Sequence, residues 1–166
     1  MNAQTSLQIE LSPEANNLPK KYCVREYRAQ YVKERGINSK IIITNNRDVH
    51  AFLQQCAPMF DPVESVAVIA LNTGNRIIGY EIIKGAVNQS AIYPANVFRF
   101  LLSVCANAFI LAHNHPGGSL VPSGSDWKLT KRLKDIGAGL DVHLLDHLII
   151  TDDTIKSMRD MTKWDG

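Results

Sequence analysis

The stretch His113-Asn-His-Pro-Gly-Gly-Ser-Leu-Val-Pro-Ser-Gly-Ser-Asp126 decides how the rest of the chain is interpreted. If His113 and His115 end a β-strand, both side chains point to the same face, because side chains alternate along a strand with a period of two. Asp126 would follow in the first turn of a helix. Two imidazole nitrogens and one carboxylate oxygen leave one position of a tetrahedral ion open, which is the ligand set of a catalytic zinc site.

The segments on either side of this motif fit such a site. The apolar run 108–112 predicts a buried strand. After the histidines, Pro-Ser-Gly-Ser-Asp predicts a helix start with Ser123 as its N-cap. Two histidines at this spacing are more often exposed polar residues, and Asp126 could simply complete a capping box with Ser123. The metal-site interpretation is favoured because it also explains why the histidines converge with Asp126.

The pattern His-x-His-Pro followed by Pro-Ser-x-x-Asp resembles the metalloprotease motif of JAB/MPN (JAMM) domains. Together with Leu-Asp-His-Leu-Ile-Ile at 145–150, it is similar to the RadC-like branch of that superfamily, and the likeness begins at about Glu64. The resemblance implies an α/β fold, a cytidine-deaminase-like sandwich in which helices flank a central mixed sheet. It also implies a zinc-dependent hydrolase that cleaves a peptide or isopeptide bond, with Zn2+ held by His113, His115 and Asp126.

The same resemblance implies two catalytic residues. JAMM domains take a carboxylate base from the first central strand, and the matching position is Glu64. Val66 stands where the family usually has an aromatic or large apolar residue, which is a mild departure. Glu64 could instead be a solvated residue at a strand start, and Glu81 on the partner strand is the competing carboxylate. The Ser of Pro-Ser-x-x-Asp, Ser123, would stabilise the oxyanion alongside zinc.

His147 lies in the last long strand of the predicted sheet. Strand alternation predicts that it shares a face with His143 and Leu145. It could be a hydrogen-bonding partner of a metal ligand or a histidine of the core with its polar atoms satisfied. It is therefore left out of the predicted ligand set.

Composition indicates an ordinary globular protein of 166 residues, with 45% hydrophobic and 20% charged residues. The net charge of +2 is too small to indicate a nucleic-acid partner by itself. Three distant cysteines without a Cys-x-x-Cys pair predict reduced, buried thiols in a cytoplasmic protein, and they count against a zinc deaminase. No signal peptide and no membrane-spanning stretch is predicted. We expect a flexible leader over 1–20 and a single domain over 21–166.

Hydrophobic periodicity predicts a mixed sheet of about five or six strands with helices packed on it. The predicted strands are 39–44, 64–71, 77–84, 108–112 and 141–151, with a further strand or ribbon over 22–34. Helices are predicted from Asn45 or Asn46 to Pro58, from Pro94, after Asp126, and over 154–161. The residues predicted to line the core from the first three helices are Val49, Phe52, Leu53, Cys56, Val97, Phe98, Leu101, Leu102, Cys105, Leu129, Leu133, Ile136 and Leu140.

A second function class is a role in DNA repair, acting on or near DNA, because RadC-like proteins carry that label. Basic residues at 128, 131, 132 and 134 could contact phosphates, although such a helix face is more often only solvated. RadC proteins typically have an N-terminal helix-hairpin-helix segment, and the first 60 residues show no glycine-bearing hairpin of that kind. A peptide or protein substrate is therefore the expected partner, and a zinc-binding module without turnover is a third outcome.

Overall fold

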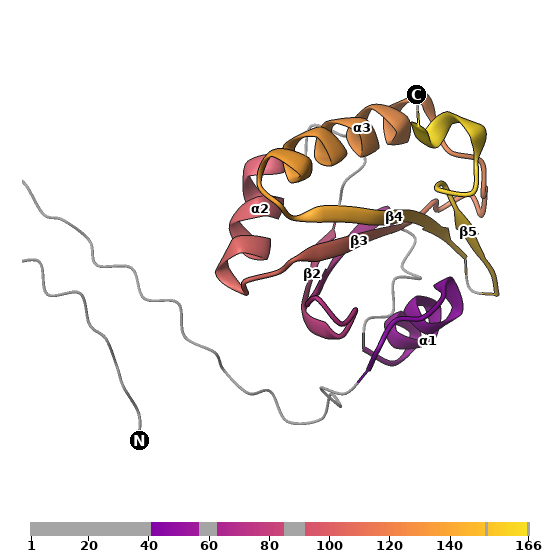
Figure 1. The fold of residues 1–166 in the computed structure, drawn as a ribbon. Coiled ribbons are helices and arrows are strands. Elements are labelled where there is room, and N and C mark those ends of the chain that lie inside the picture. The colour runs from indigo at the N-terminus through magenta and orange to yellow at the C-terminus, as the bar shows by residue number, and fades with distance from the viewer. Residues whose placement is uncertain (1–40, 57–62, 85–91, 152, 166) are drawn as a thin grey trace, which may run out of the picture. The chain divides into compact units, whose positions relative to one another are not determined.

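The described residues, 41–56, 63–84, 92–151 and 153–165, build one mixed sheet with helices on both faces in this computed structural model (Figure 1). In chain order the elements are α1 (Asn46–Cys56), β1 (Ser65–Leu71), β2 (Ile77–Lys84), α2 (Pro94–Ser103), β3 (Ala108–Asn114), α3 (Gly124–Gly139), β4 (His143–Ile150), β5 (Ile155–Ser157) and the 3-10 helix η3 (Thr162–Asp165). The predicted α/β fold class is confirmed.

The five strands lie in the order β2-β1-β3-β4-β5. β1 is antiparallel to both β2 and β3, and β5 is antiparallel to β4 at the edge. β3 and β4 are parallel, so the chain has to cross one face of the sheet between them, and α3 forms that crossover. The carboxyl end of β3 therefore meets the amino end of α3, which is where ligands bind in many open α/β sheets.

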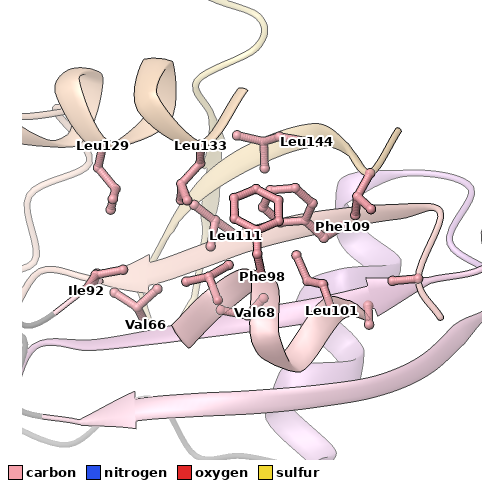
Figure 2. Packing of buried hydrophobic residues seen from close by; sticks show 14 of the residues in the cluster. Val66, Val68, Ile92, Phe98, Leu101, Phe109, Leu111, Leu129, Leu133 and Leu144 are labelled. Carbon is pink, nitrogen blue, oxygen red and sulfur yellow. The ribbon is translucent and has the colours of Figure 1, made fainter. Parts of the chain in front are cut away.

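The core has two layers, one on each face of the sheet. On one face, α2 and α3 contribute Phe98, Leu101, Leu129 and Leu133, which pack against alternate residues of β1 and β3 (Figure 2). On the other face, α1 packs over the intervening residues of the same strands (Figure 1). Every residue of β1 and β3 is buried, because helices cover these strands on both sides.

Local signals place α1 as the sequence predicts. Asn45 Oδ1 accepts from the backbone N–H groups of Arg47 and Asp48, at 2.8 and 3.3 Å, and so caps the helix that begins at Asn46. Upstream of this helix, Ile42 forms an isolated bridge with Arg76 and not a longer strand within the described residues. The predicted leader over 1–20 and the ribbon over 22–34 lie outside the described residues.

The predicted final helix over 154–161 is wrong. Ile155–Ser157 instead adds a strand to the sheet, with Ser157 paired to Leu148 of β4. The buried Asp146 carboxylate of β4 accepts from the Ser157 hydroxyl at 2.7 Å and from the Arg159 backbone N–H at 3.2 Å. This pairing with the preceding strand overrides a weak local helical pattern.

Three residues predicted for the core lie at the surface: two lie beyond the ends of their helices, and one is on the outer side of its helix. α2 ends at Ser103, and Cys105 is exposed with a positive φ of 54° where the chain turns toward β3. Leu102, on the outer side of α2, is 51% exposed, and Leu140, just after α3, is 43% exposed. The predicted burial of the Cys105 thiol is therefore wrong.

No helix in the described part of the chain is long and apolar enough to cross a lipid bilayer.

Candidate metal centre

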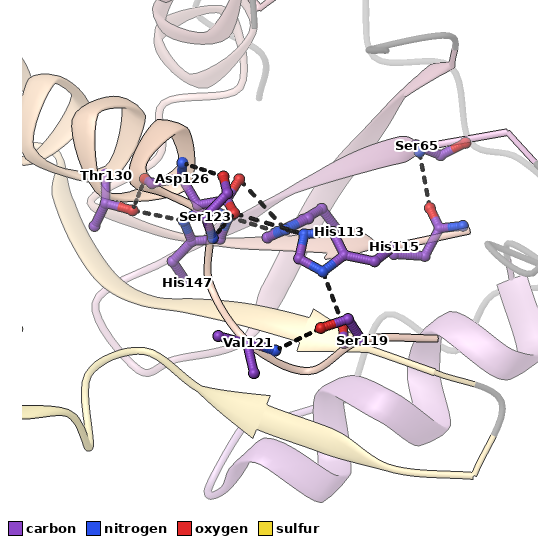
Figure 3. Close-up of polar contacts among 10 residues, drawn as sticks. Ser65, His113, His115, Ser119, Val121, Ser123, Asp126, Thr130 and His147 are labelled. Carbon is purple, nitrogen blue, oxygen red and sulfur yellow. Dashed lines mark hydrogen bonds and ion pairs between the residues drawn. The ribbon is translucent and has the colours of Figure 1, made fainter. Parts of the chain in front are cut away.

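Three predicted ligands converge where β3 ends and α3 begins (Figure 3). His113 is the penultimate residue of β3, His115 follows the strand directly, and Asp126 lies in the first turn of α3. The two imidazoles direct their Nε2 atoms at each other, 2.9 Å apart. Asp126 completes the group, with Oδ1 3.5 Å from His113 Nε2 and Oδ2 3.5 Å from His115 Nε2.

Glu64 joins this group through the strand register. β1 and β3 pair Val66 with His113, so extending the same register by two residues places Glu64 opposite His115. Ligand atoms of Glu64, His113, His115 and Asp126 all lie within 4.8 Å of one another. The competing carboxylate, Glu81, is exposed on β2 and pairs with Val68, so the described site does not include it.

The ends of β1 and β3 are tied together beside Glu64. Asn114 Oδ1 accepts from the backbone N–H of Ser65 at 2.8 Å, and both residues are buried. This bond fixes the residue that follows Glu64 against the residue that precedes His115. The pKa of the Glu64 carboxyl is raised, mainly because the group is partly buried. The charge of His115 opposes this rise in pKa, and the charge of Asp126 adds to it.

The donor set fits a divalent metal ion. His115 Nδ1 donates to the backbone carbonyl of Ser119 at 2.7 Å, so Nε2 is the ring nitrogen directed at the site. Atoms that bind a tetrahedral zinc ion at about 2.0–2.1 Å lie about 3.3–3.4 Å from one another; the two His–Asp separations of 3.5 Å are close to this, and the 2.9 Å between the two Nε2 atoms is shorter. Burial lowers the pKa of His113 to about 4, so that its imidazole is neutral, as a ligand must be, at neutral pH.

Ser123 and Asp126 form a complete capping box at the start of α3. The Asp126 backbone N–H donates to Ser123 Oγ at 3.1 Å, and the Ser123 backbone N–H donates to Asp126 Oδ2 at 2.6 Å. Asp126 Oδ1 takes no part in the box, so the cap and a metal bond are compatible. Ser123 is exposed at the start of α3, and because its Oγ accepts in the box, its own hydroxyl proton remains available.

His147 is buried and lies next to His113, one of the predicted ligands (Figure 3). His113 Nδ1 lies 2.9 Å from His147 Nε2, and His147 Nδ1 lies 2.6 Å from Thr130 Oγ1. The predicted strand face was wrong, because the register of β3 and β4 shifts between the pairs at Leu144 and Asp146. His147 therefore faces the same side as Leu144, toward α3, whereas Leu145 packs on the opposite side.

Thr130 is the residue of the site that the sequence analysis did not find. It lies one helical turn after Asp126, and its hydroxyl donates to the Asp126 carbonyl at 2.6 Å. A polar residue four positions after a predicted ligand shares its helix face, and this spacing could have identified it. In the sequence it stands beside Leu129, in a segment whose spacing indicates only a core-facing helix.

Curated relatives match more than half of this chain. A UPF0758 protein of Staphylococcus haemolyticus is 40% identical over 126 residues, which are 75% of this chain and 54% of that protein. A UPF0758 protein of Finegoldia magna is 45% identical over 98 residues, 58% of this chain and 44% of the relative. A UPF0758 protein of Vibrio cholerae is 44% identical over 95 residues, which are 57% of this chain and 60% of that protein. The chain thus spans about half the length of the curated relatives it matches.

The family model described as the RadC-like JAB domain matches residues 43–163, which include every strand and α-helix of the described residues and the four clustered side chains. The five-stranded mixed sheet is consistent with the JAB/MPN fold that the sequence motif implies. This chain belongs to the RadC-like JAB domain family.

Proposed function

We propose that this protein is a zinc-dependent hydrolase that cleaves a peptide or isopeptide bond. The observation that carries the proposal is the convergence of His113, His115 and Asp126 beside Glu64, at a place that solvent reaches. His113, His115 and Asp126 would hold the ion. A bound zinc ion supplies a Lewis acid that polarises the substrate carbonyl and makes a water molecule acidic enough to attack at neutral pH.

Glu64 is the proposed general base. Its carboxylate lies within 4.8 Å of the ligand atoms, so it can take a proton from the attacking water and deliver it to the leaving amine. Burial raises its pKa, which brings its proton affinity closer to neutrality and suits it to both steps. Ser123 would donate its hydroxyl proton to the oxyanion of the tetrahedral intermediate.

Zinc content and peptide cleavage test this proposal together. We expect about one zinc per chain in the wild-type protein and little in the His113→Ala/His115→Ala double variant. Glu64→Gln should keep the zinc and lose about 100-fold or more in cleavage of a mixed peptide library, since a base is not needed to hold the ion. Glu81→Gln is the matched control, because that carboxylate is exposed and remote from the cluster.

Two results would contradict the assignment. Full zinc content in the double histidine variant would remove His113 and His115 as ligands. Normal turnover of Glu64→Gln, together with loss of turnover in Glu81→Gln, would assign the role of general base to Glu81 on β2.

A groove beside α3 favours a second candidate function, binding of DNA. The groove has a volume of about 960 Å3, and its charged residues are five basic side chains and one acidic one. They are Lys128, Lys131, Arg132, Lys134, Lys163 and Asp135. Affinity for duplex DNA should then fall steeply with salt and weaken in Lys128→Gln/Lys131→Gln, while zinc content stays the same. Peptide cleavage without any salt-dependent DNA binding would leave only the first proposal. A cytoplasmic location remains a prediction.

A further inference from the structure

We infer that Thr130 and His147 are positioning residues that fix which nitrogen of His113 carries a proton, so that the Nε2 lone pair of His113 faces the metal. The inference rests on the metal site of the proposed function, although not on its hydrolytic activity. Its basis is a buried chain of hydrogen bonds that runs from the Asp126 carbonyl through Thr130 and His147 to His113 (Figure 3).

The direction of this chain is set at its first bond. The Asp126 backbone carbonyl can only accept, and it lies 2.6 Å from Thr130 Oγ1, so the hydroxyl must donate its one proton there. Thr130 Oγ1 can then only accept from His147 Nδ1, which is also 2.6 Å away. The neutral His147 ring therefore carries its proton on Nδ1 and has a lone pair on Nε2.

The second imidazole follows from the first. His147 Nε2 lies 2.9 Å from His113 Nδ1, and because His147 Nε2 accepts, His113 Nδ1 must be the donor. The neutral His113 ring then has its lone pair on Nε2, the atom that faces His115 and Asp126. His115 directs its Nε2 at the same place by a separate route, since its Nδ1 donates to the Ser119 carbonyl.

The opposite direction of the chain is disfavoured. It would place protons on His147 Nε2 and His113 Nε2, and the latter proton would occupy the position needed by the metal. It would also leave Thr130 Oγ1 and the Asp126 carbonyl oxygen 2.6 Å apart without a proton between them. Water cannot supply one, because the exposed fractions of Thr130, His147 and His113 are only 2%, 1% and 1%.

This series of hydrogen bonds also connects two proposed metal ligands, Asp126 and His113, through one turn of α3. Asp126 provides a carboxylate to the site, and its own carbonyl orients Thr130, which acts through His147 on His113. Partners of this kind orient a metal-binding histidine and raise its basicity, and their removal typically weakens metal binding by about 10–100-fold.

Nitrogen-15 NMR of the metal-free wild-type protein tests the inference directly. Long-range couplings in each imidazole distinguish a protonated nitrogen from an unprotonated one. We expect His147 to be protonated at Nδ1 and not at Nε2, and His113 to be protonated at Nδ1. A wild-type His147 ring protonated at Nε2 would overturn the inference, whether or not the protein hydrolyses any substrate.

Thr130→Val and Thr130→Ser form a matched pair of variants. Valine keeps the shape of the side chain but offers no acceptor to His147 Nδ1, so the His147 proton should move to Nε2 and reverse the chain. Zinc affinity, measured by competition with a chelator, should fall about 10–100-fold in Thr130→Val. Thr130→Ser should keep the wild-type affinity and the wild-type proton positions.

A purely structural role for Thr130 predicts a different pattern. In that case Thr130→Val would lower the melting temperature of the metal-free protein but leave zinc affinity and the His147 proton unchanged, and that result would overturn the inference. If Thr130→Val does not fold, His147→Gln replaces it, because its amide offers both a donor to Thr130 and an acceptor to His113. His147→Gln should retain zinc better than His147→Leu, and equal losses in the two variants would contradict the inference.

Discussion

Ser123 caps α3, and the proposed mechanism adds a second role as an oxyanion donor; one substitution separates the magnitudes of the two. In Ser123→Ala the bond from the Asp126 backbone N–H to Ser123 Oγ is lost, which should lower the free energy of unfolding by about 1 kcal/mol. The reverse bond, from the Ser123 backbone N–H to Asp126 Oδ2, does not use the Ser123 side chain and should persist. For a domain of this size the loss corresponds to a melting temperature about 2–4 °C lower.

The effect on turnover should be much larger than the effect on stability. A hydroxyl that donates to the oxyanion contributes about 3 kcal/mol to the transition state, so Ser123→Ala should reduce kcat about 100-fold or more. The hydroxyl proton of Ser123 is available for this, because its Oγ acts as an acceptor within the capping box. Zinc content should remain at the wild-type level.

Ser123→Asp is the decisive companion variant. An Asp N-cap keeps the helix capped and interacts favourably with the helix dipole, so stability should be preserved. The same carboxylate places negative charge where the oxyanion develops, and turnover should nearly vanish. Thermal melts, zinc analysis and cleavage rates are measured on both variants. Wild-type turnover in either variant with normal zinc content would refute the catalytic role and leave only the cap.

Three further predictions concern the rest of the molecule. Gly137→Ala places a Cβ 2.3 Å from the Val142 carbonyl oxygen and should lower the free energy of unfolding by about 1–3 kcal/mol. Gly139→Ala is the control, because a Cβ there meets open space and should not destabilise the protein. Urea melts of the two variants measure the difference. The metal-free protein should lose stability as the pH falls from 6.5 toward 4. Burial lowers the pKa of His113 to about 4 in the folded state, so between these pH values the unfolded chain binds more protons than the folded protein. Melting temperatures that do not change over this pH range would contradict the prediction. Native thiol labelling should fall by one equivalent in Cys105→Ser, since that thiol is exposed.

The sequence alone determined the candidate ligands, because their placement depends on local geometry. Alternation along a strand puts His113 and His115 on one face, and the N-cap signal at Ser123 puts Asp126 in a first helical turn. The mixed α/β class follows from the same short-range periodicities. Glu64 was found only by resemblance, and the register between β1 and β3 supplies the physical reason for its position.

Only the tertiary structure decided the surroundings of the candidate ligands and the end of the sheet. The irregular register near Leu144 turns His147 toward α3, and no period-two pattern can reveal a shift that depends on pairing with β3. Thr130 gains its role from a contact with β4 across the helix–sheet interface. Ile155–Ser157 becomes a strand because it pairs with the edge of the preceding strand β4 and bonds to the Asp146 carboxylate, and the helical pattern over 154–161 taken alone leaves these partners out.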